Sequence, residues 1–234
     1  EAFEALFEVE PGYLFEFDVW IIREGEPVEE LSMGFAKSFD HRPISHRNFL
    51  IPLRLEPNKP IRVVVRTKTE TDLWFRATLF ETTNFWEKDA YRTLWWGAYF
   101  GLMMVMVLYN LFLFISIRSL VYFYYVLYVF SFSVGRFLEG GFGYQYVFKY
   151  LDISFVVYAL SVVLSVVMLS FFTRSFLTLG HYFPRFDRAL LWLTMAFGIT
   201  GPFGLATDVP VIKELYFLVG VVLLSMCFVA AFGR

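Results

Sequence analysis

The sequence has little of what disulfide-linked or nucleic-acid-binding proteins need. Its 234 residues include a single cysteine, Cys227, so no disulfide can form within the chain and no pair of cysteines has a metal or redox spacing. Its 20 basic and 22 acidic residues give a formal net charge of −2, without the basic excess that follows a phosphate backbone. These scarcities argue against nucleic acid as a partner and against cysteine chemistry.

Besides the small net charge, the chain has few charged residues of either sign. Charged residues make up 18% of the chain and hydrophobic residues 58%, with a mean hydropathy of +0.56. Soluble domains are roughly 45–50% apolar and about 25% charged. Most of the charges fall in Glu1–Arg92 and few follow Trp95. The composition therefore predicts a first part that faces water and a second part that faces lipid.

The first part has the pattern of short β-strands. Apolar residues alternate with a period of two, and turn sequences such as Pro11-Gly12 separate the runs. Five or six such strands predict an antiparallel β-sandwich or jelly roll in residues 1–85, and a partial one, because a jelly roll has about eight strands. The alternating runs are Phe3–Val9, Tyr13–Ile21, Phe49–Leu55, Ile61–Val65 and Leu73–Leu79.

The second part has the pattern of membrane-spanning helices. After a polar connector at 86–93, residues 94–234 contain five apolar runs near the roughly 20 residues that cross a bilayer. The fold class is therefore mixed, a partial antiparallel β-sandwich followed by an α-helical transmembrane bundle. The predicted helices are Leu94–Ile117, Leu120–Leu138, Ile153–Phe172, Ala189–Ala206 and Leu215–Phe232.

Several short motifs, in this order, resemble one family. The residues that carry the resemblance in the apolar half are Gly97-Ala-Tyr-Phe-Gly101, Leu108-Tyr-Asn-Leu-Phe112, Arg118-Ser-Leu-Val-Tyr122, Tyr124-Tyr-Val-Leu-Tyr128, Gly140-Gly-Phe-Gly143 and His181-Tyr-Phe-Pro-Arg185. Together they resemble the bacterial seven-transmembrane receptors with diverse intracellular signalling modules, the 7TMR-DISM family. Upstream, Arg42–Leu53 and Ile61–Arg66 resemble the jelly-roll extracellular domain that precedes this bundle. Five helices are visible of the family's seven, and Glu1 stands where a Met would open a gene product, so we interpret the chain as an excerpt.

The resemblance implies a receptor of the bacterial inner membrane. Its N-terminal domain would face the periplasm, perceive a small-molecule or carbohydrate-like ligand, and control an output such as a diguanylate cyclase, a histidine kinase or a phosphatase. None of the signatures of those outputs occurs in these residues, so no catalytic residue, cofactor or metal is expected here. The alternatives are a transporter or channel and, third, an intramembrane enzyme. Lysine and arginine do not settle orientation, because five of them fall on each side.

Candidate site residues in the water-facing part are Arg42 and Arg47. Guanidinium groups offer forked donors to a polar or anionic ligand, although packing or salt bridging within the β domain is the favoured interpretation. His41 and His46, five residues apart, match no familiar zinc spacing, and we interpret them as surface-loop residues.

The membrane part offers candidates for packing and signalling rather than for chemistry. Gly97 and Gly101 form a GxxxG pair suited to close helix approach, within the bundle or, as the less favoured alternative, in a homodimer. Asn110 should point into the bundle, away from membrane lipid. A row of hydroxyls on one face of the third predicted helix, at Ser154, Tyr158, Ser161 and Ser165, suggests hydrogen bonding between helices, with a transport path as the less favoured alternative. Three further candidates are Arg136 with Glu139, a pair at i, i+3, and Pro202, a flexible point in the fourth helix.

Overall fold

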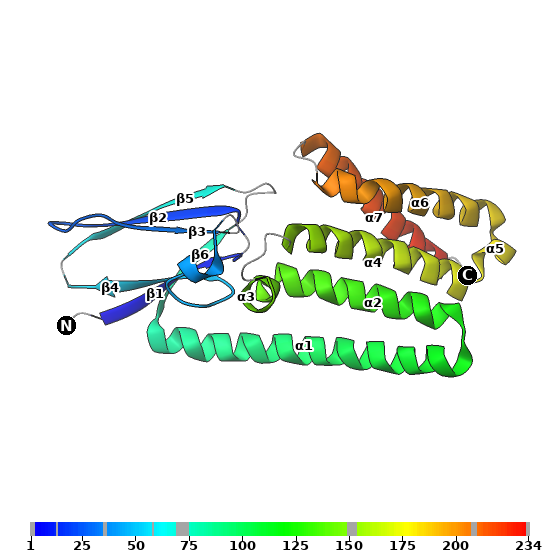
Figure 1. Ribbon diagram of the computed structural model, residues 1–234, viewed down its shortest axis with the longest axis horizontal. Helices are drawn as coiled ribbons and strands as arrows, with labels where there is room; N and C mark the ends of the chain where they lie inside the picture. The colour runs from blue at the N-terminus through cyan, green and yellow to red at the C-terminus, as the bar shows by residue number, and fades with distance from the viewer. Residues whose placement is uncertain are drawn as a thin grey trace. The chain divides into compact units, whose positions relative to one another are not determined.

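The computed structural model describes residues 3–12, 14–34, 37–57, 59–68, 75–148, 154–206 and 210–232. The chain divides into two compact units. Figure 1 labels the helices and strands that make up each unit. The first unit combines Glu1–Trp96 with Phe137–Ser154, and the second combines Gly97–Arg136 with Phe155–Arg234. Helix α1, Thr82–Ile117, is continuous and belongs to both units.

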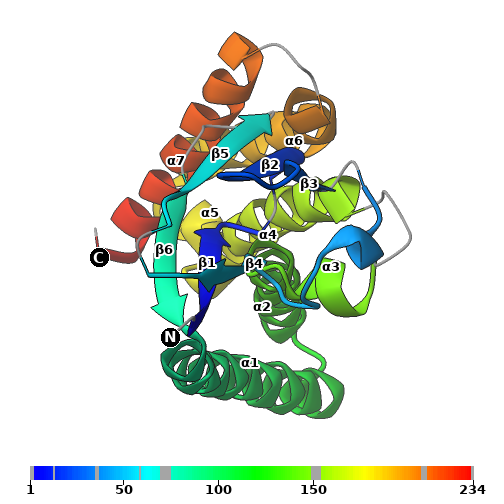
Figure 2. The same cartoon turned by 90° about the vertical axis from the view of Figure 1, so that its left-hand side faces the viewer.

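The strands described in the first unit are antiparallel and pair into two three-stranded sheets. Figure 2 shows how these strands are arranged. One sheet has the order β4-β1-β6 and the other β3-β2-β5. Their bounds are β1 Phe3–Glu10, β2 Glu16–Arg23, β3 Glu29–Met33, β4 Phe49–Leu55, β5 Ile61–Lys68 and β6 Arg76–Glu81. The predicted mixed fold with an antiparallel sandwich is confirmed, whereas its jelly-roll topology stays a prediction. Strand β3 was not predicted, because Glu29-Glu30-Leu31-Ser32-Met33 has only two apolar residues.

The sandwich core lies between the two sheets and comes from the alternating residues of the facing strands. Phe17 of β2 stacks on Phe49 of β4 with ring centroids 4.5 Å apart, and both side chains are fully buried. Val9, Val19, Ile21 and other apolar residues of the same faces complete the core. Period-two alternation therefore directs this set of side chains inward, as the sequence predicted.

Part of the outer face of sheet β4-β1-β6 is buried as well. Phe85 of α1 is fully buried against Leu6 of β1 and Leu50 of β4, with Phe80 of β6 packed beside them. Strand β1 thus has apolar partners on both faces, whereas simple alternation would leave one face in water. The first turns of α1 occupy the position of a third layer on this sheet.

The residues predicted as a connector, 86–93, are helical, and this differs from the sequence-based boundaries. They lie in α1, which begins at Thr82, where the Thr82 hydroxyl donates to the Glu4 carbonyl at 3.1 Å. A hydropathy pattern detects only the apolar part of such a helix, from Leu94 onward, so the polar turns before it escaped detection. No flexible connector joins β6 to α1, since β6 ends at Glu81 and the helix begins at the next residue.

The remaining long helices lie close to their predicted positions. They are α2 Leu120–Glu139, α4 Ser154–Phe176, α6 Pro184–Ala206 and α7 Pro210–Phe232, with the short helices α3 Phe142–Tyr146 and α5 Leu179–Tyr182 between them. Three described helices, Thr82–Ile117, Leu120–Glu139 and Val156–Phe176, are long and apolar enough to cross a membrane, and Glu214–Ala230 is a shorter apolar helix. Leu190 and Leu223 are fully buried where α4, α6 and α7 pack.

Candidate functional site

Arg42 holds the loop between the 3-10 turn Phe39–His41 and strand β4 in one conformation. Its Nη1 donates to the carbonyls of His46 (2.8 Å) and Arg47 (3.0 Å), and its Nη2 donates to the Gly12 carbonyl (2.7 Å). The guanidinium lies 4.3 Å from the centroid of the Phe49 ring. Burial lowers the pKa of Arg42 to about 10, so it stays charged at neutral pH. Arg42 therefore fixes the loop from inside.

Arg47 connects this loop to helix α1. Its Nη2 donates to Asp89 Oδ1 at 2.6 Å and its Nη1 to Thr93 Oγ1 at 3.1 Å, while only 6% of its side chain is exposed. Burial lowers the pKa of Arg47, and the nearby Asp89 carboxylate opposes that shift. The guanidinium also lies over the Phe142 ring of α3, 5.0 Å from its centroid. One buried cation thus contacts two helices.

His46 and Asn48 extend the same arrangement on either side of Arg47. The Asn48 amide N–H donates to His46 Nδ1 at 3.1 Å, which makes Nδ1 an acceptor and assigns the ring proton to Nε2. Nε2 lies 3.2 Å from Asp89 Oδ2, within ion-pair distance, although the contact does not meet the geometry of a hydrogen bond. The Asn48 side-chain amide donates to Glu8 Oε1 (2.8 Å) and Glu10 Oε1 (2.9 Å) of β1.

Arg92 of α1 completes the group by pairing with β1. Its Nη2 donates to Glu8 Oε1 at 2.9 Å and its Nη1 to Glu10 Oε1 at 2.7 Å, and Asp89 Oδ1 lies 3.5 Å from Nη2. We call the whole group the junction cluster. Its members are Glu8, Glu10, His46, Arg47, Asn48, Asp89 and Arg92. Buried ion pairs of this kind contribute little net stability, but losing one partner is costly, so the cluster favours one docking of α1 on the sandwich.

Helix α3 packs on the same loop and on the residues that precede the 3-10 turn. The Tyr144 hydroxyl donates to the Lys37 carbonyl and lies 3.2 Å from the Gly34 carbonyl. Gly141, at φ +78°, approaches so closely that an added Cβ would stand 2.9 Å from the Arg47 carbonyl oxygen. The loop is therefore held between α1 and the connection that joins α2 to α4.

Comparison with known families shows that the residues of the junction cluster are shared between two matched regions. Residues 92–234 match the family model described as 7TM diverse intracellular signalling, and residues 1–81 match the one described as 7TMR-DISM extracellular 2. The chain belongs to the 7TMR-DISM family. No curated protein and no solved structure matches it. In this 7TMR-DISM chain, Glu8 and Arg47 lie in the first matched region, Arg92 lies in the second, and Asp89 lies between them.

The structure places both predicted arginines of the 7TMR-DISM chain inside the first unit. Arg42 donates to backbone carbonyls within the sandwich, whereas Arg47 pairs with Asp89 and Thr93 of helix α1, outside the predicted β domain of residues 1–85. A ligand contact by either residue stays a prediction. The surface-loop interpretation of His46 is wrong, because His46 is 6% exposed and its ring lies 5.5 Å from that of Phe85. His41 is exposed, and no group of metal ligands occurs among the described residues.

The glycine and serine candidates of the 7TMR-DISM helices differ from expectation. Apart from chain neighbours and the backbone of α1 itself, no described atom lies within 4 Å of a Cβ added at Gly97 or Gly101, so the favoured close approach within the bundle is not observed. Ser161 and Ser165 are buried, but their hydroxyls donate to carbonyls of their own helix, Tyr158 at 2.7 Å and Val162 at 2.8 Å, and not to a neighbouring helix.

The signalling and packing roles expected of Asn110, Arg136, Glu139 and Pro202 stay predictions. Asn110 is half-buried, and its side-chain amide donates to the Met106 carbonyl of its own helix at 2.9 Å. Arg136 is half-buried and Glu139 exposed near the end of α2. The backbone of Pro202 continues helix α6, and its side chain lies outside the described residues.

Sequence reasoning missed the three junction residues that matter most, Glu8, Asp89 and Arg92. Glu8 was not singled out in the sequence, yet it is 2% exposed. A signal for the other two was available, because Phe85, Asp89 and Arg92 recur at i, i+4 and i+7 and so share one helix face. That spacing indicates an amphipathic helix that begins before the apolar run.

Removing the Tyr144 hydroxyl tests the docking of α3. Tyr144→Phe should destabilise the first unit by about 1 kcal/mol, because the Lys37 carbonyl loses its donor. Urea unfolding of the detergent-solubilised chain, followed by tryptophan fluorescence, measures the effect. Tyr146→Phe is the matched control, since that side chain is 69% exposed. Equal stability of the two variants would contradict a docked α3.

Proposed function

We propose that this chain is the sensory and transmembrane part of a bacterial signal-transduction receptor. Its β-sandwich would perceive a ligand outside the cytoplasm, and α1 would carry the response to a cytoplasmic output such as a diguanylate cyclase or a histidine kinase. Family membership and three candidate membrane spans support this role. The observation that carries the proposal is the unbroken course of α1 from the junction cluster to Ile117.

The proposed location is the bacterial inner membrane, with the sandwich in the periplasm. The description of the first matched family as extracellular supports this side. Helix α3 contacts the sandwich, so the connection between α2 and α4 lies on the same side of the membrane. If α1 and α2 each cross once, Arg118 between them reaches the cytoplasm, in line with the positive-inside rule.

The mechanism follows from how α1 is held. Its first turns bind the sandwich through Phe85 in an apolar contact and through Asp89 and Arg92 in ionic ones. A ligand that favours another arrangement of the sandwich must therefore also move α1. Such a ligand acts only through its different affinities for the two arrangements, a coupling worth typically about 1–3 kcal/mol. The resemblance suggests a small-molecule or carbohydrate-like ligand, and its class stays a prediction.

The proposal is tested by interrupting helix α1 with flexible residues just after the junction cluster. Arg47→Met perturbs the junction and should change the output of the full-length receptor. Inserting Gly-Ser-Gly-Ser between Trp96 and Gly97 interrupts the helix after its docked turns, so Arg47→Met should then leave the output unchanged. The matched control inserts four alanines at the same point, which keep the segment helical and should preserve the effect of Arg47→Met.

The measurement is output activity of the six proteins, with and without Arg47→Met in each of the three backgrounds. An equal effect of Arg47→Met in the Gly-Ser and alanine backgrounds would contradict coupling through a stiff α1. No effect in any background would show that the junction cluster does not belong to the signalling route.

A further inference from the structure

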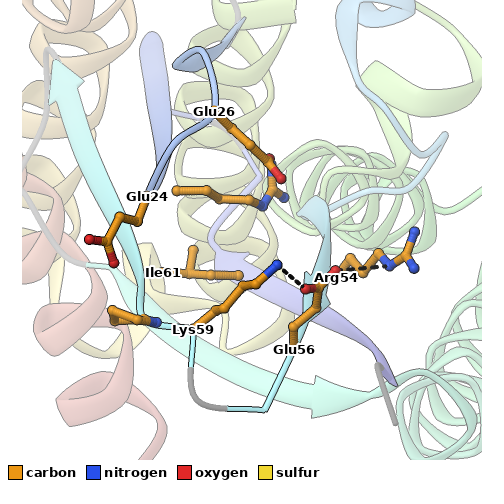
Figure 3. A pocket seen from close by; sticks show the side chains of 8 residues that line it. Glu24, Glu26, Arg54, Glu56, Lys59 and Ile61 are labelled. Atoms are coloured by element: carbon orange, nitrogen blue, oxygen red, sulfur yellow. Dashed lines mark ion pairs between the residues drawn. The ribbon is translucent and has the colours of Figure 1, made fainter.

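Two turns at one end of the sandwich enclose a cleft of about 260 Å³. One wall is the β2–β3 turn with Arg23, Glu24 and Glu26, and the other is the β4–β5 connection. We call this site the charged cleft. Its second wall and base consist of Arg54, Glu56, Lys59, Pro60 and Ile61 (Figure 3). It lies at the Leu55 end of β4, whereas Asn48 of the junction cluster precedes the other end of that strand.

The charges of the cleft are balanced and accessible. Among the described residues, three cations and three carboxylates line it, and Figure 3 shows Arg54 and Lys59 both reaching toward Glu56. The Lys59 Nζ to Glu56 Oε2 distance is 2.7 Å, and this pairing raises the pKa of Lys59 and lowers the pKa of Glu56, so both groups stay ionised at neutral pH. Glu24 forms no ion pair with any described residue.

These ion pairs can be exchanged for a ligand at small cost. The side chains of Lys59 and Arg54 are 68% and 73% exposed, and solvent-exposed pairs contribute little net stability. A simple anion or cation would gain attraction from half of the lining and meet repulsion from the other half. A molecule with one charge of each sign gains at both ends, with its carboxylate on Arg54 or Lys59 and its ammonium on Glu24 or Glu26.

We propose that the charged cleft binds a small zwitterion of the α-amino acid type. Its volume is below the roughly 300–1,000 Å³ of sites for drug-sized ligands, so a single amino acid suits it better than an oligomer. No aromatic side chain occurs among the described residues that line it, which makes it a poor platform for a sugar ring.

This inference rests on the proposed function for its consequence, since β4 links the cleft to the junction. Arg54 stands in the cleft, and β4 runs from Leu55 back to Phe49, next to Asn48 and its hydrogen bond to Glu8. At about 3.3 Å per residue the strand spans roughly 20 Å. A ligand that draws the two turns together would shift β4 along this path.

Binding to the full chain in lipid nanodiscs tests the site directly, by isothermal titration calorimetry. The probe is first a mixture of the protein amino acids and then each one singly. The best binder is compared with its N-acetyl derivative, which keeps only the carboxylate, with its amide, which keeps only the ammonium, and with D-glucose. We expect saturable binding of the amino acid and at least about tenfold weaker binding of the other three, equivalent to about 1.4 kcal/mol.

Variants assign the binding to the cleft. Glu24→Gln and Arg54→Gln should each weaken it at least about tenfold, and Glu30→Gln, an exposed residue of β3 outside the cleft, should not. Absence of saturable amino acid binding, equal binding of the singly charged derivatives, or insensitivity to Glu24→Gln and Arg54→Gln would each overturn the proposal. Binding that meets all expectations but leaves the output unchanged would instead contradict the proposed receptor function.

Discussion

Asp89→Ala is expected to destabilise the first unit by about 3–5 kcal/mol, because it leaves the Arg47 guanidinium buried without its carboxylate. Arg47→Met should cost less. Asp89 then keeps two partners, His46 Nε2 at 3.2 Å and Arg92 Nη2 at 3.5 Å. The two substitutions differ in cost because Asp89 has other ionic partners besides Arg47, whereas Arg47 has no other carboxylate partner among the ion pairs described above. Urea unfolding of the detergent-solubilised chain, followed by tryptophan fluorescence, measures both free energies of unfolding.

The double variant Arg47→Met with Asp89→Leu is the control for a purely steric effect. Removing both charges leaves no stranded ion from this pair, so the double variant should be more stable than Asp89→Ala alone. If Asp89→Ala changes stability by less than about 0.5 kcal/mol, as an exposed surface substitution does, the buried junction is contradicted.

Gly12→Ala should cost about 3 kcal/mol or more, at the upper end of overpacking effects. A Cβ at Gly12 would lie 1.7 Å from the Arg47 carbonyl oxygen and 2.7 Å from its carbonyl carbon. Because both atoms belong to the backbone, no side-chain rotation relieves the clash. The loop that carries Arg47 must move, and the hydrogen bond from Arg42 to the Gly12 carbonyl is strained with it.

Gly97→Ala is the matched control, since no described atom, apart from chain neighbours and the backbone of α1 itself, lies within 4 Å of a Cβ at that position. Within a helix this change should be neutral or should stabilise by up to about 1 kcal/mol. The same unfolding measurement compares the two variants. A Gly12→Ala protein as stable as the parent would show that the loop does not pack against Gly12.

The sequence predicted the elements whose apolar pattern is simple. Alternation located β1, β2, β4 and β5, and hydropathy located the apolar part of α1 and the whole of α2. Strand β3 was not detected because an edge strand with exposed acids, such as Glu29 and Glu30, has a weak apolar pattern. The turns of α1 from Thr82 to Thr93 escaped because their stability comes from docking on a sheet that the sequence alone does not place.

The site was harder to predict than the fold, for a related reason. Arg42 and Arg47 attracted attention as charged residues in a loop, but whether a guanidinium faces water depends on its partners. Those partners, Gly12, Asp89 and Thr93, lie 30 to 46 residues away in sequence. Glu8 was not singled out because simple alternation leaves one face of a strand in water, whereas α1 packs on that face here.

The residues of the junction cluster come from both matched regions, and this limits how the sandwich and the bundle of different family members can be exchanged. A crossover between residues 81 and 92, in the gap between the two family matches, would separate Glu8, Glu10 and Arg47 from Arg92. A sandwich joined in this way to the bundle of a relative keeps the cluster only if that relative supplies the complementary charges at the same helix positions. The two modules are thus adjacent in sequence but constrained as a pair, and chimeric receptors should be joined with the whole of Thr82–Trp96 accompanying the sandwich.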